Sequence, residues 1–380
     1  MPSGGNTMPS ESKTIPHGGG EYVFFIPDGK WSDHFSSLLL SGDIPATVLE
    51  VVLVASLFLV STLYPHQVQA THSIPLLDLA YFMILFSIIR RLYNSYLEAV
   101  FCTFPQYRTQ PVKEHALKTE KDLTGRDLTQ LASIVKHDRL TLITQFLLDV
   151  SIYFLVPGYY PAQQPSYGPM YIRILRLVIN HYVMSFGMYW MHRALHVHPW
   201  LWRRIHSLHH WAKHPLSRTT YQDHWADNFG NAIVGHFFAQ ILVPLDYQFF
   251  LLSRILRICE SLEKHSGVSC WFNIAHSLQK YFPFAQMPHH HDWHHEGHKG
   301  CNYTFSSIGG LWDCVFGTRK AGRHPGVAET REDRKMTVQD IKKDRRGVMM
   351  DHPYLCLAPV LAMGIVAGIK YQLFGIQTLN

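Results

Sequence analysis

The stretch HRALHVHPWLWRRIHSLHHWAKH (residues 192–214) packs seven histidines into 23 residues and decides how the rest of the chain is interpreted. The chain has 380 residues and 26 histidines, of which 18 lie within residues 181–298. Neither a soluble core nor an ordinary protein surface needs so many imidazole rings in one window. Since histidine is the commonest metal ligand among side chains, the cluster predicts a metal site.

The histidines repeat with the spacing of a helix face. On an α-helix, positions i, i+3 and i+4 share one face, so three sets are expected to point inward from single helices. The sets are His192 and His196; His206, His209 and His210; and His291, His294 and His295. One metal ion takes about four to six ligands, and imidazole suits zinc, iron, copper and nickel. Eight imidazoles therefore imply two ions, or one ion with a surplus of ligands.

Each ligating imidazole must be neutral, and a partner usually holds its other ring nitrogen. Of the carboxylates near the three sets, Asp227, Asp292 and Glu263 are predicted to have this supporting role. A histidine that stands alone, such as His236 or His276, is more typical of a core or an interface than of a metal site.

The composition favours a chain that lies partly in lipid. Hydrophobic residues make up 47% of the chain and charged residues 16%, against about 25% charged in soluble domains. A membrane span needs about 20 mostly apolar residues. Four stretches approach this standard, at residues 44–64, 74–93, 139–157 and 171–190. We therefore expect an all-α integral membrane protein, with helical hairpins in the bilayer.

The basic residues predict how the hairpins are oriented. The loops at residues 65–73 and 158–170 contain no Lys or Arg, whereas residues 90–139 contain nine. Because Lys and Arg favour the cytosolic side, the open ends of the hairpins and the histidine-rich helical bundle are expected there. The apolar stretch 233–258 lies between histidine sets. A full crossing would separate them, so a buried or re-entrant helix pair is expected.

The same patterns divide the chain into five regions. They are a flexible tail (1–40), transmembrane helices with a cytosolic loop (41–174), the histidine-rich catalytic region (175–318), a charged cytosolic connector (319–352) and a hydrophobic helix (353–380). The formal net charge of +6 comes from Lys and Arg in loops beside apolar runs, which favours a membrane surface over nucleic acid.

The boxes HRALH, HSLHH and HDWHH, followed by Asn302 and Tyr303, resemble the fatty acid hydroxylase/sterol desaturase superfamily of membrane non-haem di-iron enzymes. HWAD, with His224 and Asp227, and EKHSG, with His265, are similar to the family's intermediate elements. The resemblance covers roughly residues 175–318 and implies that His224 and His265 are further ligands. Trp225 stands where the family usually has proline, and Asp227 where it usually has glutamate.

The resemblance implies two iron ions, O2 and a lipid substrate that enters from the bilayer. It also implies a multi-pass protein of the endoplasmic reticulum membrane whose active site faces the cytosol. The chain has no GxGxxG fingerprint, so electrons from NAD(P)H are expected through a separate cytochrome b5 or flavoprotein reductase.

Among the possible reactions, epoxidation of squalene to 2,3-oxidosqualene ranks narrowly first. The reason is that the sequence around the second box, HSLHH, differs from the pattern of C4-methyl sterol oxidases and C5 sterol desaturases. The alternatives are a C4-methyl sterol oxidase, a C5 sterol desaturase and a fatty acyl or sphingolipid hydroxylase. A histidine-rich metal transporter is the alternative from another class. It is disfavoured because the histidines form ordered sets outside the clearest spans.

Overall fold

The described part of the chain is helical, as expected. The computed structural model describes residues 44–63, 74–104, 107–109, 125–162, 168–212, 215–270, 273–279, 281–295, 300–306, 308–320 and 353–376. Within these ranges the only β pairing is an isolated bridge between Arg108 and Val268. The predicted tail 1–40 and nearly all of the predicted connector 319–352 lie outside the described residues.

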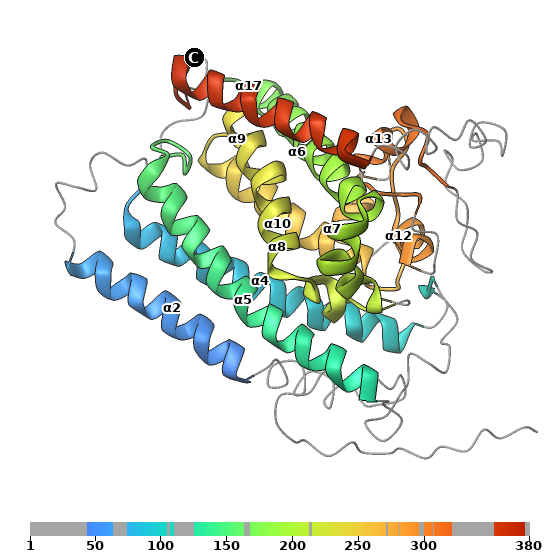
Figure 1. Ribbon diagram of the computed structural model, residues 1–380. Helices are drawn as coiled ribbons and strands as arrows, with labels where there is room; N and C mark the ends of the chain where they lie inside the picture. The colour runs from blue at the N-terminus through green and yellow to red at the C-terminus, as the bar shows by residue number, and fades with distance from the viewer. Residues whose placement is uncertain are drawn as a thin grey trace, which may run out of the picture.

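Six long helices form the body of the protein (Figure 1). They are α2 (Ile44–Leu63), α4 (Leu76–Thr103), α5 (Gly125–Leu155), α6 (Met170–Val197), α10 (Tyr247–Lys264) and α17 (Ala358–Phe374). Helix α2 packs on α4 and α5, α4 packs on α10, and α17 packs on α6. In Figure 1, α2 and α17 lie on opposite sides of the body, with α6 and α10 between them.

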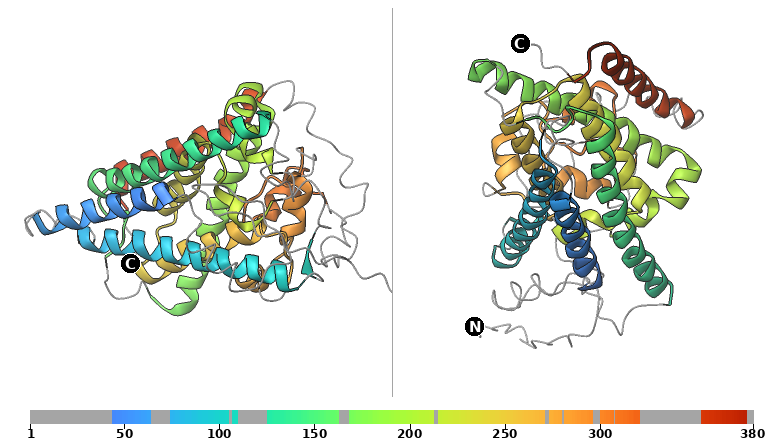
Figure 2. Two further views of the ribbon diagram at one scale, coloured as in Figure 1. Left: turned by 90° about the horizontal axis from the view of Figure 1, so that it is seen from below. Right: turned by 90° about the vertical axis from the view of Figure 1, so that its left-hand side faces the viewer.

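Ten short helices complete the described chain. They are α7 (Pro199–Arg204), η4 (His206–Trp211), η5 (Ser217–Tyr221), α8 (Trp225–Asn231), η6 (Ala232–Phe237), α9 (Phe238–Leu242), α11 (Ile274–Gln279), α12 (Pro288–His295), α13 (Gly310–Val315) and η7 (Pro353–Leu357). Helices α7, α12 and α13 gather near the C-terminal end of α6 (Figures 1 and 2). The expected helix pair at 233–258 is present, as η6 with α9 followed by α10.

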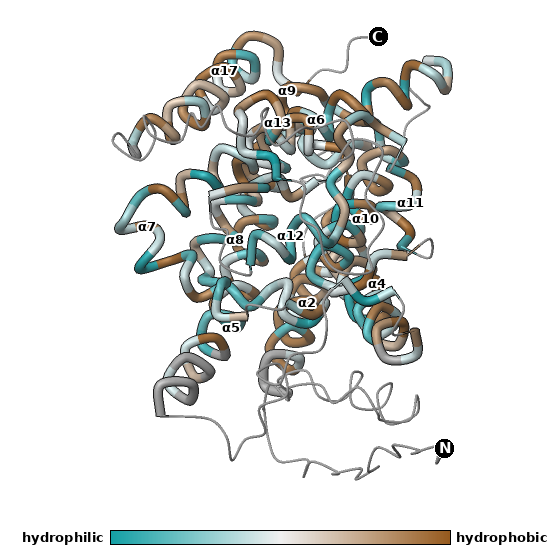
Figure 3. The backbone as a smooth tube through the Cα atoms, turned by 90° about the vertical axis from the view of Figure 1, so that its right-hand side faces the viewer, coloured by the Kyte–Doolittle hydropathy of each residue, from teal (hydrophilic) through white to brown (hydrophobic). Residues whose placement is uncertain are grey.

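Helices lie where the four early spans were predicted, but apolar character is unevenly distributed among them. By length and mean hydropathy, one helix of the described chain, Tyr354–Phe374, is suited to cross a membrane, and Thr47–Leu63 is apolar but shorter. Large aliphatic side chains stand exposed on both, among them Leu59 and Leu361, at 62% and 65% exposure. Figure 3 shows this apolar character along α17. The four-span topology stays a prediction.

A buried ion pair joins the start of α6 to the start of α10. The Arg173 guanidinium donates to both carboxylate oxygens of Asp246, at 2.7 and 3.0 Å. Asp246 also caps α10, because its side chain accepts from the backbone N–H of Phe249 at 3.1 Å. A bidentate pair of this kind fixes geometry as well as energy. The two helices that carry metal-site histidines at their far ends are thereby held in register.

Helix α6 also lies very close to η6, which is a π-helix. A Cβ atom added to Gly187 would stand 2.3 Å from the carbonyl oxygen of Val234. This glycine therefore allows a backbone approach that any larger residue would block.

Replacing Gly187 with Ala should lower the free energy of unfolding by about 1–3 kcal/mol, because the added methyl group must push η6 away. The measurement is the thermal unfolding midpoint of the purified protein in detergent. Gly368→Ala in α17 is the matched control. Nothing lies within 4 Å of its added Cβ, so it should be neutral or stabilise by up to about 1 kcal/mol. Equal midpoints for Gly187→Ala and the wild type would contradict the close approach.

Candidate metal centre

Four segments deliver histidines to one buried region of the protein. His192 and His196 lie on the last two turns of α6, and His265 is the residue that ends α10. Helix η4 carries the second histidine set and α12 carries the third. All of these rings are buried except that of His196, which is partly buried.

The histidines form two groups, each with its ligand atoms within 4.8 Å of one another. The first group is His192, His196, His206, His210 and His294, and the second is His209, His265, His291 and His295. The groups do not follow the three sequence sets. The second set lies on a 3₁₀ helix and not on the expected α-helix face. The adjacent His209 and His210 reach different groups, and so do the adjacent His294 and His295 on the α-helix α12.

The distances between ring nitrogens fit a bound cation. In the first group, Nε2 of His206 lies 2.9 Å from that of His196 and 3.0 Å from that of His192. In the second, Nε2 of His291 lies 2.9 Å from that of His265 and 3.1 Å from that of His295. A metal–nitrogen bond of about 2.1 Å places neighbouring ligands at right angles about 3.0 Å apart. Each group therefore has the spacing of a metal ligand set.

Backbone carbonyls orient four of the rings. Nδ1 of His192 and of His294 each lie 2.6 Å from a carbonyl oxygen, those of Tyr303 and Cys301. His265 and His295 make the same kind of contact, at 2.9 and 3.0 Å. A carbonyl oxygen only accepts, so each Nδ1 carries the proton and each Nε2 presents a lone pair. Lone pairs that face one another cannot hydrogen-bond, which is why a shared cation suits them.

A carboxylate orients a fifth ring. Oδ2 of Asp227 lies 2.6 Å from Nδ1 of His206, and its other oxygen accepts from Nδ2 of Asn231 at 2.7 Å. The structure thus places Asp227 in the supporting position that the sequence predicted. Asp292 accepts from the hydroxyl of Thr109. Glu263 accepts from the backbone N–H groups of Ala275 and His276, both at 2.8 Å, and so holds α11 against α10.

The structure corrects the interpretation of His224, which belongs to neither group. It precedes α8, and its Nδ1 accepts from the backbone N–H of Ala226 at 3.1 Å. Its ring packs on that of His137, with 4.0 Å between centroids. Capping turns the ring back toward the helix end, while Asp227, three residues later, points at His206. Nine of the ten predicted ligands are therefore brought together.

Burial keeps these rings neutral. Removal from water, followed by the neighbouring imidazole of His206, lowers the pKa of His209 to about 3. Burial, with neighbouring histidines, also holds the pKa of His210 and His291 well below the usual range. A neutral ring is the form that binds a metal. The two groups contain no carboxylate, so two divalent ions here would bring four positive charges, and Asp227 offers a nearby negative charge.

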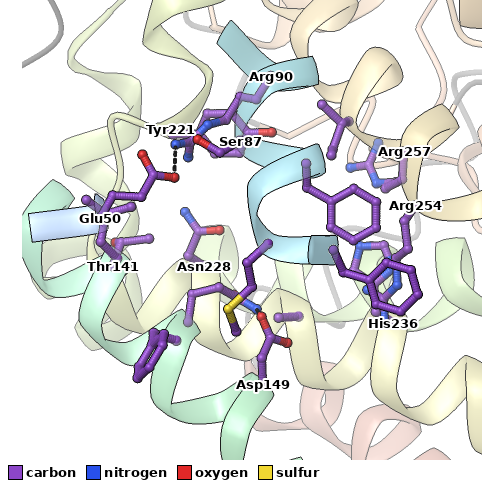
Figure 4. A pocket seen from close by; sticks show the side chains of 18 of the residues that line it. Glu50, Ser87, Arg90, Thr141, Asp149, Tyr221, Asn228, His236, Arg254 and Arg257 are labelled. Atoms are coloured by element: carbon purple, nitrogen blue, oxygen red, sulfur yellow. Dashed lines mark hydrogen bonds and ion pairs between the residues drawn. The ribbon is translucent and has the colours of Figure 1, made fainter. Parts of the chain in front are cut away.

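A cavity of about 310 Å³ lies beside the centre, between α2, α4, α5, α8, η6 and α10 (Figure 4). Apolar side chains such as Phe82, Met83 and Phe86 form much of its wall. Two of its lining residues contact the metal-site histidines or their partners. Asn231 bonds the carboxylate that holds His206, and the carbonyl of Ser261 accepts from His265. The lining residue Ser261 thus contacts the second group directly, and the lining residue Asn231 reaches the first group through Asp227.

Residues 177–318 match the family model described as fatty acid hydroxylase. The chain is 32% identical over 160 residues to very-long-chain aldehyde decarbonylase GL1-10 of Oryza sativa subsp. japonica, covering 42% of this chain and 50% of that protein. It is 28% identical over 175 residues to methylsterol monooxygenase 1-3 of Arabidopsis thaliana, covering 44% and 57%. The chain thus spans about half the length of these curated relatives. No solved structure matches it.

The two groups should lose metal separately. His210→Ala removes a ligand from the first group and His209→Ala from the second, so each variant should bind about one ion fewer than the wild type. Metal per chain is measured by elemental analysis of the purified protein. His224→Ala is the control, because its ring lies outside both groups, and it should retain the wild-type content. Loss of metal in His224→Ala alone would contradict the assignment.

Asp227→Asn should weaken metal binding at the first group by about 10- to 100-fold, since partners that orient a ligating histidine have effects of this size. One amide oxygen cannot replace two carboxylate oxygens that accept from His206 and Asn231. A competitive titration with a chelator measures the affinity. Asp223→Asn is the matched control, because Asp223 accepts from Asn228 at 2.8 Å. An unchanged affinity in Asp227→Asn would refute this role.

Proposed function

We propose that this chain, whose residues 177–318 belong to the fatty acid hydroxylase/sterol desaturase superfamily, is an oxygen-dependent lipid oxidoreductase with two iron ions. The observation that carries the proposal is the pair of buried all-histidine groups beside an apolar cavity. The relatives named as monooxygenases and decarbonylases support an oxidoreductase, and the cavity supports a lipid as its substrate.

The chain's own residues hold, orient and shield the centre. Nine imidazoles would bind the two ions, and five of them are fixed by hydrogen bonds from Nδ1. When bound, the ions supply the activation of O2 and the oxidation of a carbon–hydrogen bond or an alkene. The rings of His192, His291 and His294 have no exposed surface, so water is kept from the reacting region. Exclusion of water prevents side reactions of a reactive oxidant.

We infer a sterol-class lipid as the substrate. The relatives named methylsterol monooxygenase favour oxidation of a methyl sterol. Squalene epoxidation, the first choice from the sequence, has no support among these relatives and is kept as the competing hypothesis. The relatives named aldehyde decarbonylase add a long-chain aldehyde as a third substrate to test.

The electron donor and the cellular membrane are inferred from the same family resemblance. We infer a cytochrome b5 or a flavoprotein reductase as the donor of electrons from NAD(P)H. Arg203 and Arg204 are exposed at the end of α7, immediately before the second histidine set. A basic surface of this kind is suited to an acidic donor. The endoplasmic reticulum membrane, with the histidine groups on the cytosolic side, agrees with the apolar outer faces of α2 and α17.

A metal transporter is the less supported function. Transport requires that ions move past their ligands, whereas here hydrogen bonds fix five of the nine rings. A transporter would exchange metal without consuming oxygen.

The decisive test uses membranes that contain the expressed protein. Metal content and reductant-dependent oxygen uptake are measured with a C4-methyl sterol, squalene or a long-chain aldehyde added in turn. We expect two irons per chain and uptake triggered by the methyl sterol. The double variant His209→Ala/His210→Ala, which removes a ligand from each group, should lose both iron and uptake and still insert in the membrane. Bound metal without uptake for any lipid would reject the oxidoreductase.

A further inference from the structure

We infer that His236, together with Arg254 and Arg257, forms a polar end of the cavity that holds a hydroxyl or carbonyl oxygen of the lipid. The cavity would thereby select an oxygenated lipid over a pure hydrocarbon. This inference rests on the proposed function, since it assigns the cavity to the substrate. It concerns a histidine that neither metal group uses.

The polar side chains of this end come from two neighbouring elements. His236 lies on the π-helix η6, and Arg254 and Arg257 lie on α10. All three line the cavity, and Figure 4 shows them gathered on one side of it. The remaining wall combines apolar side chains, such as Leu79 and Phe82, with polar ones that include Glu50, Arg90 and Asp149. A π-helical turn inside an α-helical segment is frequently found at a functional site.

His236 has hydrogen-bonding capacity that the protein leaves unused. Within the part of the chain that the structure describes, no hydrogen bond involves its ring. Burial, followed by the two nearby arginines, holds its pKa well below the usual range. The ring is therefore neutral and offers one N–H donor and one acceptor nitrogen. The residue is partly buried in the cavity wall, so a bound hydroxyl can pair with the donor or the acceptor.

Both arginines already have hydrogen-bond partners. Their guanidinium groups are therefore fixed in place and bring positive charge to this end of the cavity. Arg254 donates to the hydroxyl of Tyr159. Arg257 donates to the carbonyl of Phe305 at 3.1 Å and to Glu260 at 3.4 Å. Their positive charge favours the negative end of an oxygen dipole and opposes a cationic ligand. A neutral oxygen group needs no further counter-charge, which matches the chemistry of a sterol hydroxyl or ketone.

The polar end extends along α10 toward the metal groups, because Arg257 lies four residues before Ser261 and its partner Phe305 stacks on His192. Ser261, which holds His265, and Arg254 both line the cavity on α10. Seven residues separate them, which is about 10 Å along a helix. A lipid whose oxygen is held beside His236 and Arg254 therefore extends its hydrocarbon part toward the histidine groups. The anchor positions the lipid without taking part in the oxidation.

The test measures lipid binding without turnover. The full chain is purified in detergent with its iron and kept without oxygen or reductant. A radiolabelled 4,4-dimethyl sterol is bound and then displaced by three competitors: the unlabelled sterol, its 3-deoxy counterpart and squalene. One net hydrogen bond corresponds to a preference of about fivefold to tenfold. We expect the wild type to prefer the hydroxylated sterol over the deoxy sterol by this factor.

Three variants locate the preference. His236→Phe keeps a ring of similar size but removes both polar atoms, so it should bind the two sterols about equally. His236→Gln restores a donor and an acceptor and should recover most of the preference. Phe86→Leu, on the apolar wall, should weaken both sterols alike. Iron content and the unfolding midpoint show whether each variant is folded.

The inference is overturned if the wild type binds the deoxy sterol or squalene as tightly as the hydroxylated sterol, or if His236→Phe keeps the preference. Should lipid-triggered oxygen uptake occur while that preference survives in His236→Phe, the inference fails alone. If lipid binding depends on His236 but the protein contains no iron and consumes no oxygen, the oxidoreductase proposal fails and the inferred polar end is retained.

Discussion

The convergence of neutral imidazoles on two points is the constraint on which the rest of the structure depends. Nε2 atoms of different rings approach within about 3 Å, as in His192 with His206 and His265 with His291. Their lone pairs repel unless a cation lies between them. The fold must therefore hold the rings from behind, and for five of the nine it does so with groups that only accept hydrogen bonds. Long helices joined by the buried Arg173–Asp246 pair provide the rigidity that this requires.

Loops after α6 supply most of the hydrogen-bond acceptors that hold these rings. The carbonyls of Cys301 and Tyr303, just beyond α12, hold His294 and His192. Asp313 on α13 in turn accepts from the backbone N–H groups of Tyr303 and Thr304, at 2.8 and 2.9 Å. The segment 301–304, which follows the third histidine set, therefore orients ligands that lie on two different helices, α12 and α6. Removing Asp313 would loosen rings that it does not contact.

The sequence predicted the helical class, and local spacing singled out eight of the nine histidines that the structure brings together, while His265 came from the family resemblance. It could not predict the division into two groups, since members of one local set, such as His209 and His210 or His294 and His295, join histidines from other segments of the chain. It also could not identify carbonyl partners, because every residue has a carbonyl and only the folded chain selects among them. Asp227 was found because a carboxylate stands out in a sequence. His224, which only the family resemblance suggested as a ligand, instead caps a helix.

The unused ring of His236 was passed over for a related reason, since a lone histidine in an apolar stretch is typical of a core residue. Its position in the cavity wall instead supports a role in binding the lipid. A hydrocarbon such as squalene fills space and leaves the ring of His236 without a hydrogen-bond partner, whereas an oxygenated lipid supplies one. The relatives named methylsterol monooxygenase act on substrates of that second kind by name. The polar end thus favours an oxygenated lipid on evidence from this chain alone, namely the unpaired ring nitrogens of His236 in the cavity wall.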